Sequence, residues 1–353
     1  MRKPTKAVLT GAAVAALLVP CTVNAVANSG RGRPHQDTSA TTLGALGKRA
    51  GLRIGTAVDT SALAEDASYR ARAASEFTSV TPENVMKWDA VEGQRGRYDW
   101  SEADKLVDFA RANGQLVRGH TLLWHNQLPG WLTTADLGAD ELRAVLRKHI
   151  TDEARHFKGR IWQWDVVNEA FDDDGTLRDS IWLRKLGPGY IADAFRWAHE
   201  ADPKAKLFIN DYNIEGVNAK STALLELVTR LREQHVPIDG VGIQGHLAVQ
   251  YNAPHDIAAN MKRFDDLGLE TAITEADVRI PMPSDSTGQE AQAEGYDVLL
   301  RGCLLTRRCT DFTVWGFSDT YSWVPSTFEG EGAATSSTRT TGPSPPTGRS
   351  WTT

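Results

Sequence analysis

Two glutamates stand where a pair of carboxyl groups could do acid–base and nucleophilic chemistry. Glu169 ends the apolar run that begins at Ile161, and Glu275 ends the run that begins at Thr271. A carboxyl group at such a position is costly unless it is solvated, paired or used in a reaction. Two carboxyl groups can cleave a glycosidic bond, because one protonates the leaving oxygen while the other attacks the anomeric carbon or activates water. The alternative for each glutamate is a structural role in an ion pair.

Other polar and aromatic side chains stand at the ends of similar apolar runs. They are Glu83, Asn84, His120, Trp124, Asn168, Asp211, Tyr212, Gln244 and His246. In a barrel of parallel strands the carboxyl ends of all strands meet at one face, and such barrels build their active sites there. We therefore expect these side chains to converge around the two glutamates.

The apolar runs alternate with amphipathic stretches, which indicates alternating strands and helices. The runs expected to be strands are Arg53–Asp59, Phe77–Asn84, Leu116–Trp124, Ile161–Glu169, Ala205–Asn213, Gly240–Leu247, Glu270–Arg279 and Phe312–Asp319. Apolar residues at helical spacing predict helices over 142–157 and 224–231. Eight such units predict the α/β class and a closed (β/α)8 TIM barrel. An open doubly wound sheet is the alternative, although no glycine-rich phosphate loop follows the first run.

Six segments carry motifs that can be compared with known families. They are Thr81–Trp88, Arg118–His125, Trp164–Phe171, Gly242–Leu247, Ile273–Asp277 and Val314–Phe317. In this order they resemble the endo-β-1,4-xylanases of glycoside hydrolase family 10, particularly its actinobacterial members. The resemblance runs from about Leu52 to Ala334. It implies endo-hydrolysis of xylan and xylo-oligosaccharides with retention of configuration at the anomeric carbon.

The resemblance also implies roles for individual residues. Glu169 is similar to the family's acid/base and Glu275 to its nucleophile, which would be oriented by a hydrogen bond from His246. Asn168 resembles the residue that contacts the 2-hydroxyl of the sugar beside the scissile bond. The residues that match the glycone-side binding set are Glu83, Asn84, Lys87, His120, Trp124 and Gln127. Those that match residues bordering the cleavage point or covering the glycone sugars are Tyr212, Gln244, Trp315 and Trp323.

Several neighbouring residues are expected to support the structure. Those assigned to packing or to hydrogen-bond networks are Trp88, His125, Trp162, Trp164, Asp165 and Asp277. The acidic run 172–174, followed by Gly175, predicts a solvated turn, and a calcium site is the alternative.

Composition and the N-terminus bear on partners and location. With 39 basic and 45 acidic residues the net charge is −6, which argues against nucleic acid as a partner. Arg2, Lys3 and Lys6 precede a short apolar run over 8–19. This pattern predicts a signal peptide at 1–27, cleaved after Ala27, and a secreted, extracellular protein. Residues 28–42 are expected to form a flexible leader. We expect a monomer without membrane attachment, cofactor or metal.

Removal of the signal peptide, with Cys21 inside it, leaves two cysteines. Cys303 and Cys309 are separated by five residues. In a secreted protein such a pair most simply forms a disulfide, which would staple a local turn. A metal site at the two thiols is the alternative.

The C-terminus departs from the family. The catalytic barrel is expected over 43–334, and residues 335–353 have no helical periodicity and a composition typical of disorder. The family normally ends in a closing helix, so we expect the barrel to lack it. Our hypothesis is a shift of the reading frame near codon 334, since codons can be chosen so that the shifted tail encodes a family-like ending. A natural disordered tail is the alternative.

Three other functions remain open from the sequence. The first is a β-1,4-glucanase of the same broad clan, which would have to admit a hydroxymethyl group on each sugar. The second is a catalytically impaired, xylan-binding product that results from the altered C-terminus. The third is a metal-dependent sugar isomerase on a barrel, which should show a denser cluster of carboxylates and histidines.

Overall fold

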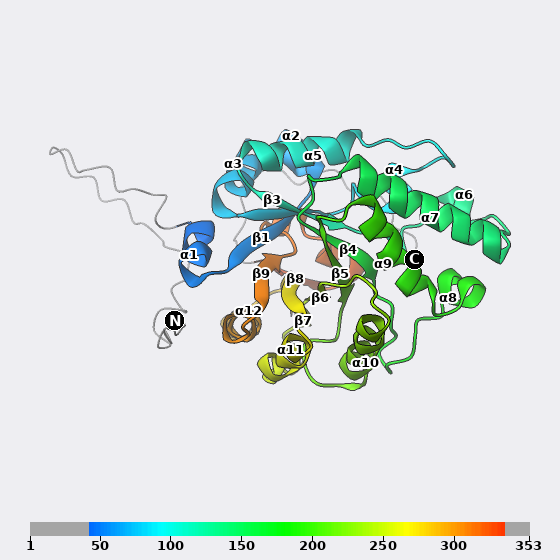
Figure 1. The fold of residues 1–353 in the computed structure, drawn as a ribbon. Helices are drawn as coiled ribbons and strands as arrows, with labels where there is room; N and C mark the ends of the chain where they lie inside the picture. Colours follow the sequence, from blue (N-terminus) through cyan, green and yellow to red (C-terminus); the bar gives the residue numbers. More distant parts are fainter. Residues whose placement is uncertain (1–41, 336–353) are drawn as a thin grey trace, which may run out of the picture.

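The computed structural model describes residues 42–335 and shows eight parallel strands closed into a barrel in this part of the chain (Figure 1). The strands are β1 (Arg53–Val58), β2 (Ser79–Pro82), β3 (Leu116–His120), β4 (Gln163–Asn168), β5 (Lys206–Asp211), β6 (Gly240–Ile243), β8 (Glu270–Pro281) and β9 (Cys309–Val314). Strand β9 pairs with both β8 and β1, which closes the ring. The predicted (β/α)8 architecture is confirmed, and the open doubly wound sheet is excluded.

Helices surround this ring of strands (Figure 1). Those that follow successive strands are α3 (Ala67–Glu76), α5 (Ser101–Ala112), α7 (Ala139–His156), α9 (Tyr190–Ala201), α10 (Ala219–Glu233), α11 (Ile257–Asp266) and α12 (Ser286–Leu305). Shorter ones are α1 (Leu43–Ala50), α2 (Thr60–Glu65), α4 (Trp88–Val91), α6 (Gly130–Thr133), α8 (Ile181–Leu186), α13 (Val324–Thr327) and a 3₁₀ helix at Asp319–Tyr321. The two helices predicted over 142–157 and 224–231 are α7 and α10.

The helix ends follow from local sequence. Helix α7 has acidic residues in its first turn and basic residues in its last turn, which complement the helix dipole. Helix α10 starts with a capping box, in which Asn218 and Ser221 each bind the other's backbone N–H through a side chain. These signals set where the helices start and stop, and hence where the loops at the barrel's rim begin.

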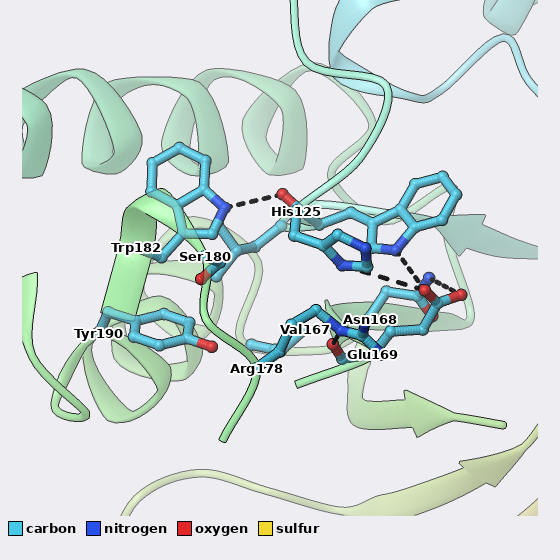
Figure 2. Close-up of a pocket in the computed structure, with 10 residues that line it drawn as sticks. His125, Val167, Asn168, Glu169, Arg178, Ser180, Trp182 and Tyr190 are labelled. Atoms are coloured by element: carbon cyan, nitrogen blue, oxygen red, sulfur yellow. Dashed lines mark hydrogen bonds and ion pairs between the residues drawn. The ribbon is translucent and has the colours of Figure 1, made fainter. Parts of the chain in front are cut away.

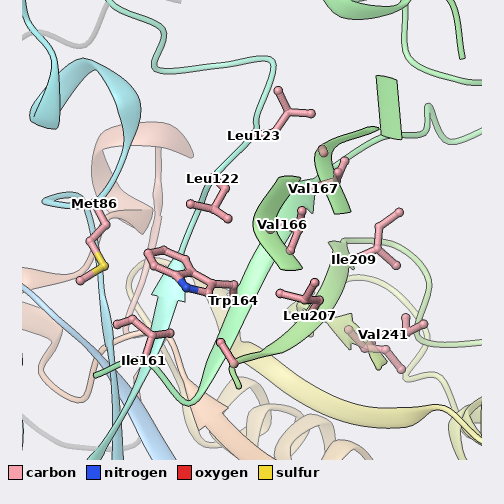
Figure 3. Close-up of a cluster of buried hydrophobic side chains, with 14 of the residues drawn as sticks. Met86, Leu122, Leu123, Ile161, Trp164, Val166, Val167, Leu207, Ile209 and Val241 are labelled. Atoms are coloured by element: carbon pink, nitrogen blue, oxygen red, sulfur yellow. The ribbon is translucent and has the colours of Figure 1, made fainter. Parts of the chain in front are cut away.

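The apolar core lies between strands and helices, whereas charged residues enter the barrel interior. Trp164 on β4 is fully buried among apolar side chains (Figure 3). Its ring also packs against Phe157, which directly follows α7. A β-carbon at Gly119 on β3 would lie 2.2 Å from the Trp164 ring, so only glycine fits there. On the alternate positions of the same two strands, Arg118 and Asp165 form a buried ion pair. The packing role predicted for Trp164 is confirmed.

The predicted strand Gly240–Leu247 is wrong in one respect, because it is two strands. Strand β6 ends at Ile243, and β7 (His246–Ala248) starts separately and pairs with β8. Gly245 lies between them with a φ of +79°, a conformation that glycine adopts without a steric penalty. A further strand, β10 (Glu331–Gly332), pairs antiparallel with the end of β8.

Cys303 near the end of α12 and Cys309 at the start of β9 form a disulfide. The predicted pairing is confirmed, and the two thiols are not available as metal ligands. The bridge closes a short loop and restricts the unfolded chain, which is the main way that disulfides stabilise proteins.

Three predictions fall largely outside the described residues: the signal peptide, the leader and the tail over 335–353. Between β9 and Thr335, the described chain contains only the 3₁₀ helix and α13 as helical segments. Within residues 42–335, no helix is long and apolar enough to cross a membrane.

Candidate active site

The two predicted carboxylates are joined through amide side chains. Asn210 on β5 donates one hydrogen bond to Glu275 Oε1 at 2.7 Å and another to Asn168 Oδ1 at 2.8 Å. Asn168 donates to Glu169 Oε1 at 3.3 Å, and Gln244 donates to the same oxygen at 3.1 Å. Glu169 directly follows β4, and Glu275 lies within β8. The carboxylates therefore belong to one hydrogen-bonded cluster, as the convergence of strand ends predicted.

Asn210 belongs to this cluster and is not among the residues predicted from the sequence. Its side chain is fully buried, and its Oδ1 accepts a hydrogen bond from Thr274 Oγ1 at 2.7 Å. The signal that could have found it is the two-residue period of strand β5. Phe208 lies beside Arg118 in the barrel interior, so the residue two positions later also points inward.

Glu275 is held by His246, as predicted. The imidazole Nε2 lies 3.1 Å from Glu275 Oε2, and Nδ1 lies 2.9 Å from Asp277 Oδ1. Burial alone would lower the pKa of His246, but Asp277 and Glu275 raise it to about 10. Burial would likewise raise the pKa of Glu275, but the hydrogen bond from His246 brings it below its ordinary value. At neutral pH the cluster therefore contains an imidazolium beside an ionised Glu275.

Glu169 has a different set of partners (Figure 2). Trp124 donates its indole N–H to Glu169 Oε2 at 2.8 Å, and Trp182 donates to the carbonyl oxygen of Trp124 at 2.8 Å. The imidazole Nδ1 of His125 lies 4.0 Å from Glu169 Oε2. Burial lowers the pKa of His125, although the carboxylate beside it opposes the shift. His125, for which a structural role is expected, has its ring beside the carboxylate of Glu169.

The backbone of Glu169 is strained. Its φ is +56°, a left-handed conformation that costs a residue with a β-carbon of the order of 1–3 kcal/mol. Two contacts hold it there. The Glu169 N–H donates to the carbonyl of Asn210 at 2.8 Å, and the Glu169 carbonyl accepts from Arg178 Nε at 2.9 Å. Strain held in place by neighbours in this way is typical of functional sites.

Four of the predicted glycone-side residues, Glu83, Asn84, Lys87 and Gln127, interact with one another, and Lys87 also contacts Trp124. Lys87 Nζ donates to Asn84 Oδ1 at 3.2 Å and lies 5.0 Å from the centroid of the Trp124 ring. Gln127 Nε2 donates to the same oxygen of Asn84 at 3.4 Å. Burial raises the pKa of Glu83 to about 7, and Lys87 opposes this shift. The set offers donors, acceptors and an aromatic ring within one region.

Of the other predicted residues, Trp315 and Trp323 lie close to His246, and His120 contacts Trp315. Tyr212 lies on the side of Glu169, where its hydroxyl accepts a hydrogen bond from Arg178. The Trp323 ring centroid is 5.0 Å from that of His246, and its indole N–H donates to Asp277 Oδ2 at 2.7 Å. The Trp315 ring centroid is 6.2 Å from His246 and 5.4 Å from His120. Aromatic rings therefore flank the carboxylate cluster on the side of His246.

A buried ion pair between Arg118 and Asp165 lies inside the barrel, on the strands β3 and β4. Arg118 Nε donates to both carboxylate oxygens of Asp165, and His120 Nδ1 lies 3.1 Å from Asp165 Oδ2. Burial would raise the pKa of Asp165, but Arg118 brings it below its ordinary value. The network role predicted for Asp165 is confirmed, and Asp277 has the same kind of role beside His246.

The acidic run 172–174 forms a turn whose carboxylates point to separate partners. Asp172 pairs with Arg178 at 3.0 Å, Asp173 with Lys220 at 3.3 Å, and Asp174 accepts from Thr176 at 2.7 Å. This arrangement confirms the predicted turn. In residues 42–335, no group of three or more His, Cys, Asp or Glu side chains could hold a metal ion.

Comparisons with known proteins agree with this geometry. The sequence profile of the Glycosyl hydrolase family 10 matches residues 42–341, which extends seven positions past the boundary set at Ala334. An endo-1,4-beta-xylanase of Agaricus bisporus is 45% identical over 295 residues, spanning 83% of this chain and 88% of that protein.

Solved structures give the same result. Native xylanase 10B from Thermotoga maritima is 44% identical with a TM-score of 0.81, and the match covers 83% of this chain and 92% of that one. Xylanase 10B from Thermotoga petrophila, solved in complex with xylobiose, is 43% identical with a TM-score of 0.81, over 83% and 91% of the two chains. These relatives come from a fungus and from Thermotoga, so an actinobacterial origin stays a prediction. The sequence profile, the relatives and the barrel together show that the chain belongs to glycosyl hydrolase family 10.

Proposed function

We propose that this protein is an endo-1,4-β-xylanase that cleaves β-1,4-xylosidic bonds in xylan and xylo-oligosaccharides with retention of configuration. The observation that carries the proposal is the pair of carboxylates with unlike surroundings. Glu275 contacts an imidazolium and the amide of Asn210, which favours its charged form. Glu169 contacts an indole and neutral amides. The relatives named above, which are xylanases, support the choice of substrate.

In the first step Glu275 is the nucleophile. One of its oxygens forms a bond to the anomeric carbon while the bond from that carbon to the leaving oxygen breaks. Glu169 gives its proton to the leaving oxygen, so the departing sugar leaves as a neutral alcohol. A covalent glycosyl–enzyme ester remains, as in other retaining glycosidases.

In the second step Glu169 acts as a base. It takes a proton from a water molecule, whose oxygen attacks the anomeric carbon and displaces the Glu275 carboxylate. Two inversions at one carbon give net retention. Asn168 lies between the carboxylates in the hydrogen-bond chain, a place from which its amide can contact the 2-hydroxyl of the reacting sugar.

The test is hydrolysis of xylan, with carboxymethylcellulose as the competing substrate. We expect reducing sugar and short oligosaccharides from xylan, and a β-anomer as the first product seen by ¹H NMR. Glu169→Gln should lower the rate by at least about 100-fold, since general acid–base groups contribute roughly 10²–10⁴-fold. Glu275→Gln should abolish measurable hydrolysis, because no carboxylate is left to form the covalent intermediate. Glu226→Gln, at a helix residue whose side chain is 66% exposed, is the matched control.

Three outcomes would contradict the proposal. Faster hydrolysis of carboxymethylcellulose would indicate a glucanase, and a first α-anomer would indicate inversion. A folded wild-type protein that binds xylan without releasing product would indicate a binding protein. We further propose that the protein is secreted and acts outside the cell, because residues 1–27 have the pattern of a signal peptide.

A further inference from the structure

A buried cation lies beneath the ring of Tyr212. Lys220, near the start of α10, is fully buried, although lysine is seldom buried without a paired charge. Its Nζ lies 3.4 Å from the centroid of the Tyr212 ring, 3.0 Å from Asp211 Oδ1 and 3.3 Å from Asp173 Oδ1. The ammonium is therefore held between two carboxylates and one aromatic face.

This position is electrostatically unfavourable for a cation. The first turn of a helix presents unpaired backbone N–H groups and a positive dipole end, so a positive charge is disfavoured there. Removing the ammonium from water adds a desolvation cost. The carboxylate of Asp211, which is itself fully buried, and the π face of Tyr212 offset these terms. An aliphatic side chain would avoid these costs, but it would leave the buried carboxylate of Asp211 without its cationic partner, so the ammonium itself has a role here.

The hydroxyl end of Tyr212 is held as well. Arg178 Nη2 donates to the Tyr212 hydroxyl at 2.8 Å. The same guanidinium donates to the carbonyl oxygens of Glu169 at 2.9 Å and Phe171 at 2.8 Å. Arg178 thus connects the edge of the Tyr212 ring to the backbone of Glu169. The ring is fixed on one face by Lys220 and at its tip by Arg178, while the side chain remains partly exposed.

We propose that Lys220 is a positioning residue, which holds Tyr212 as the stacking platform for the sugar on the leaving-group side of the scissile bond. This inference rests on the proposed function, in which Glu169 protonates the oxygen of that sugar. Since Lys220 occupies one face of the ring, a xylose unit stacks on the opposite face. A ring already fixed in place spares the substrate the cost of ordering it, and Arg178 sets its position relative to Glu169.

The experiment compares two substrates, of which only one has a leaving group that can stack on Tyr212. Xylotetraose places a sugar against Tyr212, whereas β-xylobiosyl fluoride releases fluoride and places nothing there. Immobilising a side chain costs about 0.5–1.5 kcal/mol, which corresponds to about a two- to twelvefold change. We expect Lys220→Met to lower the ratio of kcat/KM for xylotetraose to kcat/KM for the fluoride by this factor.

A double-mutant cycle separates positioning from a general structural effect. In a Tyr212→Ala background, Lys220→Met should leave the substrate ratio unchanged to within about 1.5-fold, because no ring remains to be positioned. An equal fall of the ratio in both backgrounds, or no fall in either, would overturn the inference.

A milder variant covers the case in which Lys220→Met does not fold. Asp173→Asn changes a residue whose side chain is 64% exposed, and it weakens the ion pair that helps to hold the Lys220 ammonium in place. It should lower the ratio by a smaller factor, again only when Tyr212 is present. A wild-type protein that releases nothing from xylan would instead refute the proposed function, whereas an active wild type with an additive cycle refutes the role of Lys220 alone.

Discussion

Replacing Asn210 by alanine removes the amide that joins the two halves of the cluster. The amide donates to the ionised Glu275 at 2.7 Å and to Asn168 at 2.8 Å. A hydrogen bond to a charged group is worth about 1.5–3 kcal/mol. We expect this interaction to stabilise the transition state by its full value. Its loss then lowers kcat/KM by about 10- to 160-fold, at 1.36 kcal/mol per factor of ten. This would place Asn210 among the residues on which catalysis depends strongly.

The same substitution has a defined effect on the pH dependence. The amide donor favours the charged form of Glu275, so its removal raises the pKa of that carboxyl group. The acidic limb of the kcat/KM profile should therefore move to higher pH. The assay measures kcat and KM on an aryl xylobioside, which is cleaved at a single bond, between about pH 4 and pH 8.

Thr274→Val is the matched control, because the Thr274 hydroxyl hydrogen-bonds to Asn210. Its hydroxyl donates to Asn210 Oδ1 at 2.7 Å, a neutral hydrogen bond worth about 0.5–1.5 kcal/mol. We expect a smaller loss of activity and a smaller shift of the acidic limb. An Asn210→Ala variant that loses less than about threefold in kcat/KM, or whose acidic limb moves to lower pH, would refute the reasoning.

Four further predictions follow from other contacts. The pKa of His246 is raised to about 10, so its stabilising contribution is complete below about pH 6.5 and is lost as the pH rises toward 10. Urea titrations should therefore show that His246→Asn lowers the free energy of unfolding most near pH 6 and less near pH 9. Trp182→Phe removes a hydrogen bond to the carbonyl of Trp124 and should lower kcat/KM about two- to twelvefold on xylotetraose. Replacing Cys303 and Cys309 by serine should lower the free energy of unfolding by about 2 kcal/mol, measured in urea without reductant. Dialysis against EDTA should leave the rate of xylan hydrolysis unchanged, whereas a loss of activity would show that the hydrolysis depends on a metal ion.

The barrel and most of the cluster could be predicted because they depend on local patterns. Each apolar run that ends in polar residues is a strand whose end meets the others at one face. Glu169 was predicted in this way, as was the contact between His246 and Glu275. The disulfide was predictable because the chain has only two cysteines outside the segment with the pattern of a signal peptide.

What could not be predicted depends on distant parts of the chain. Lys220 stands in the first turn of an amphipathic helix, where a lysine is normally solvated, and its burial follows from the carboxylates of Asp211 and Asp173. Asn210 is one polar residue in an apolar strand, and its role depends on β4 and β8 arriving beside it. The break between β6 and β7 depends on the conformation of Gly245, which sequence alone leaves undefined.

Asp277 has a consequence for how the site could be observed. It accepts a hydrogen bond from the indole of Trp323 through one oxygen and faces the imidazole of His246 through the other. We therefore expect the charge of the imidazole to affect that indole through Asp277. Indole emission is sensitive to charge nearby, so the fluorescence difference between the wild type and Trp323→Phe should titrate with His246. Trp323 would then be an intrinsic fluorescent reporter of the charge beside Glu275, which can be read without a substrate or an added dye.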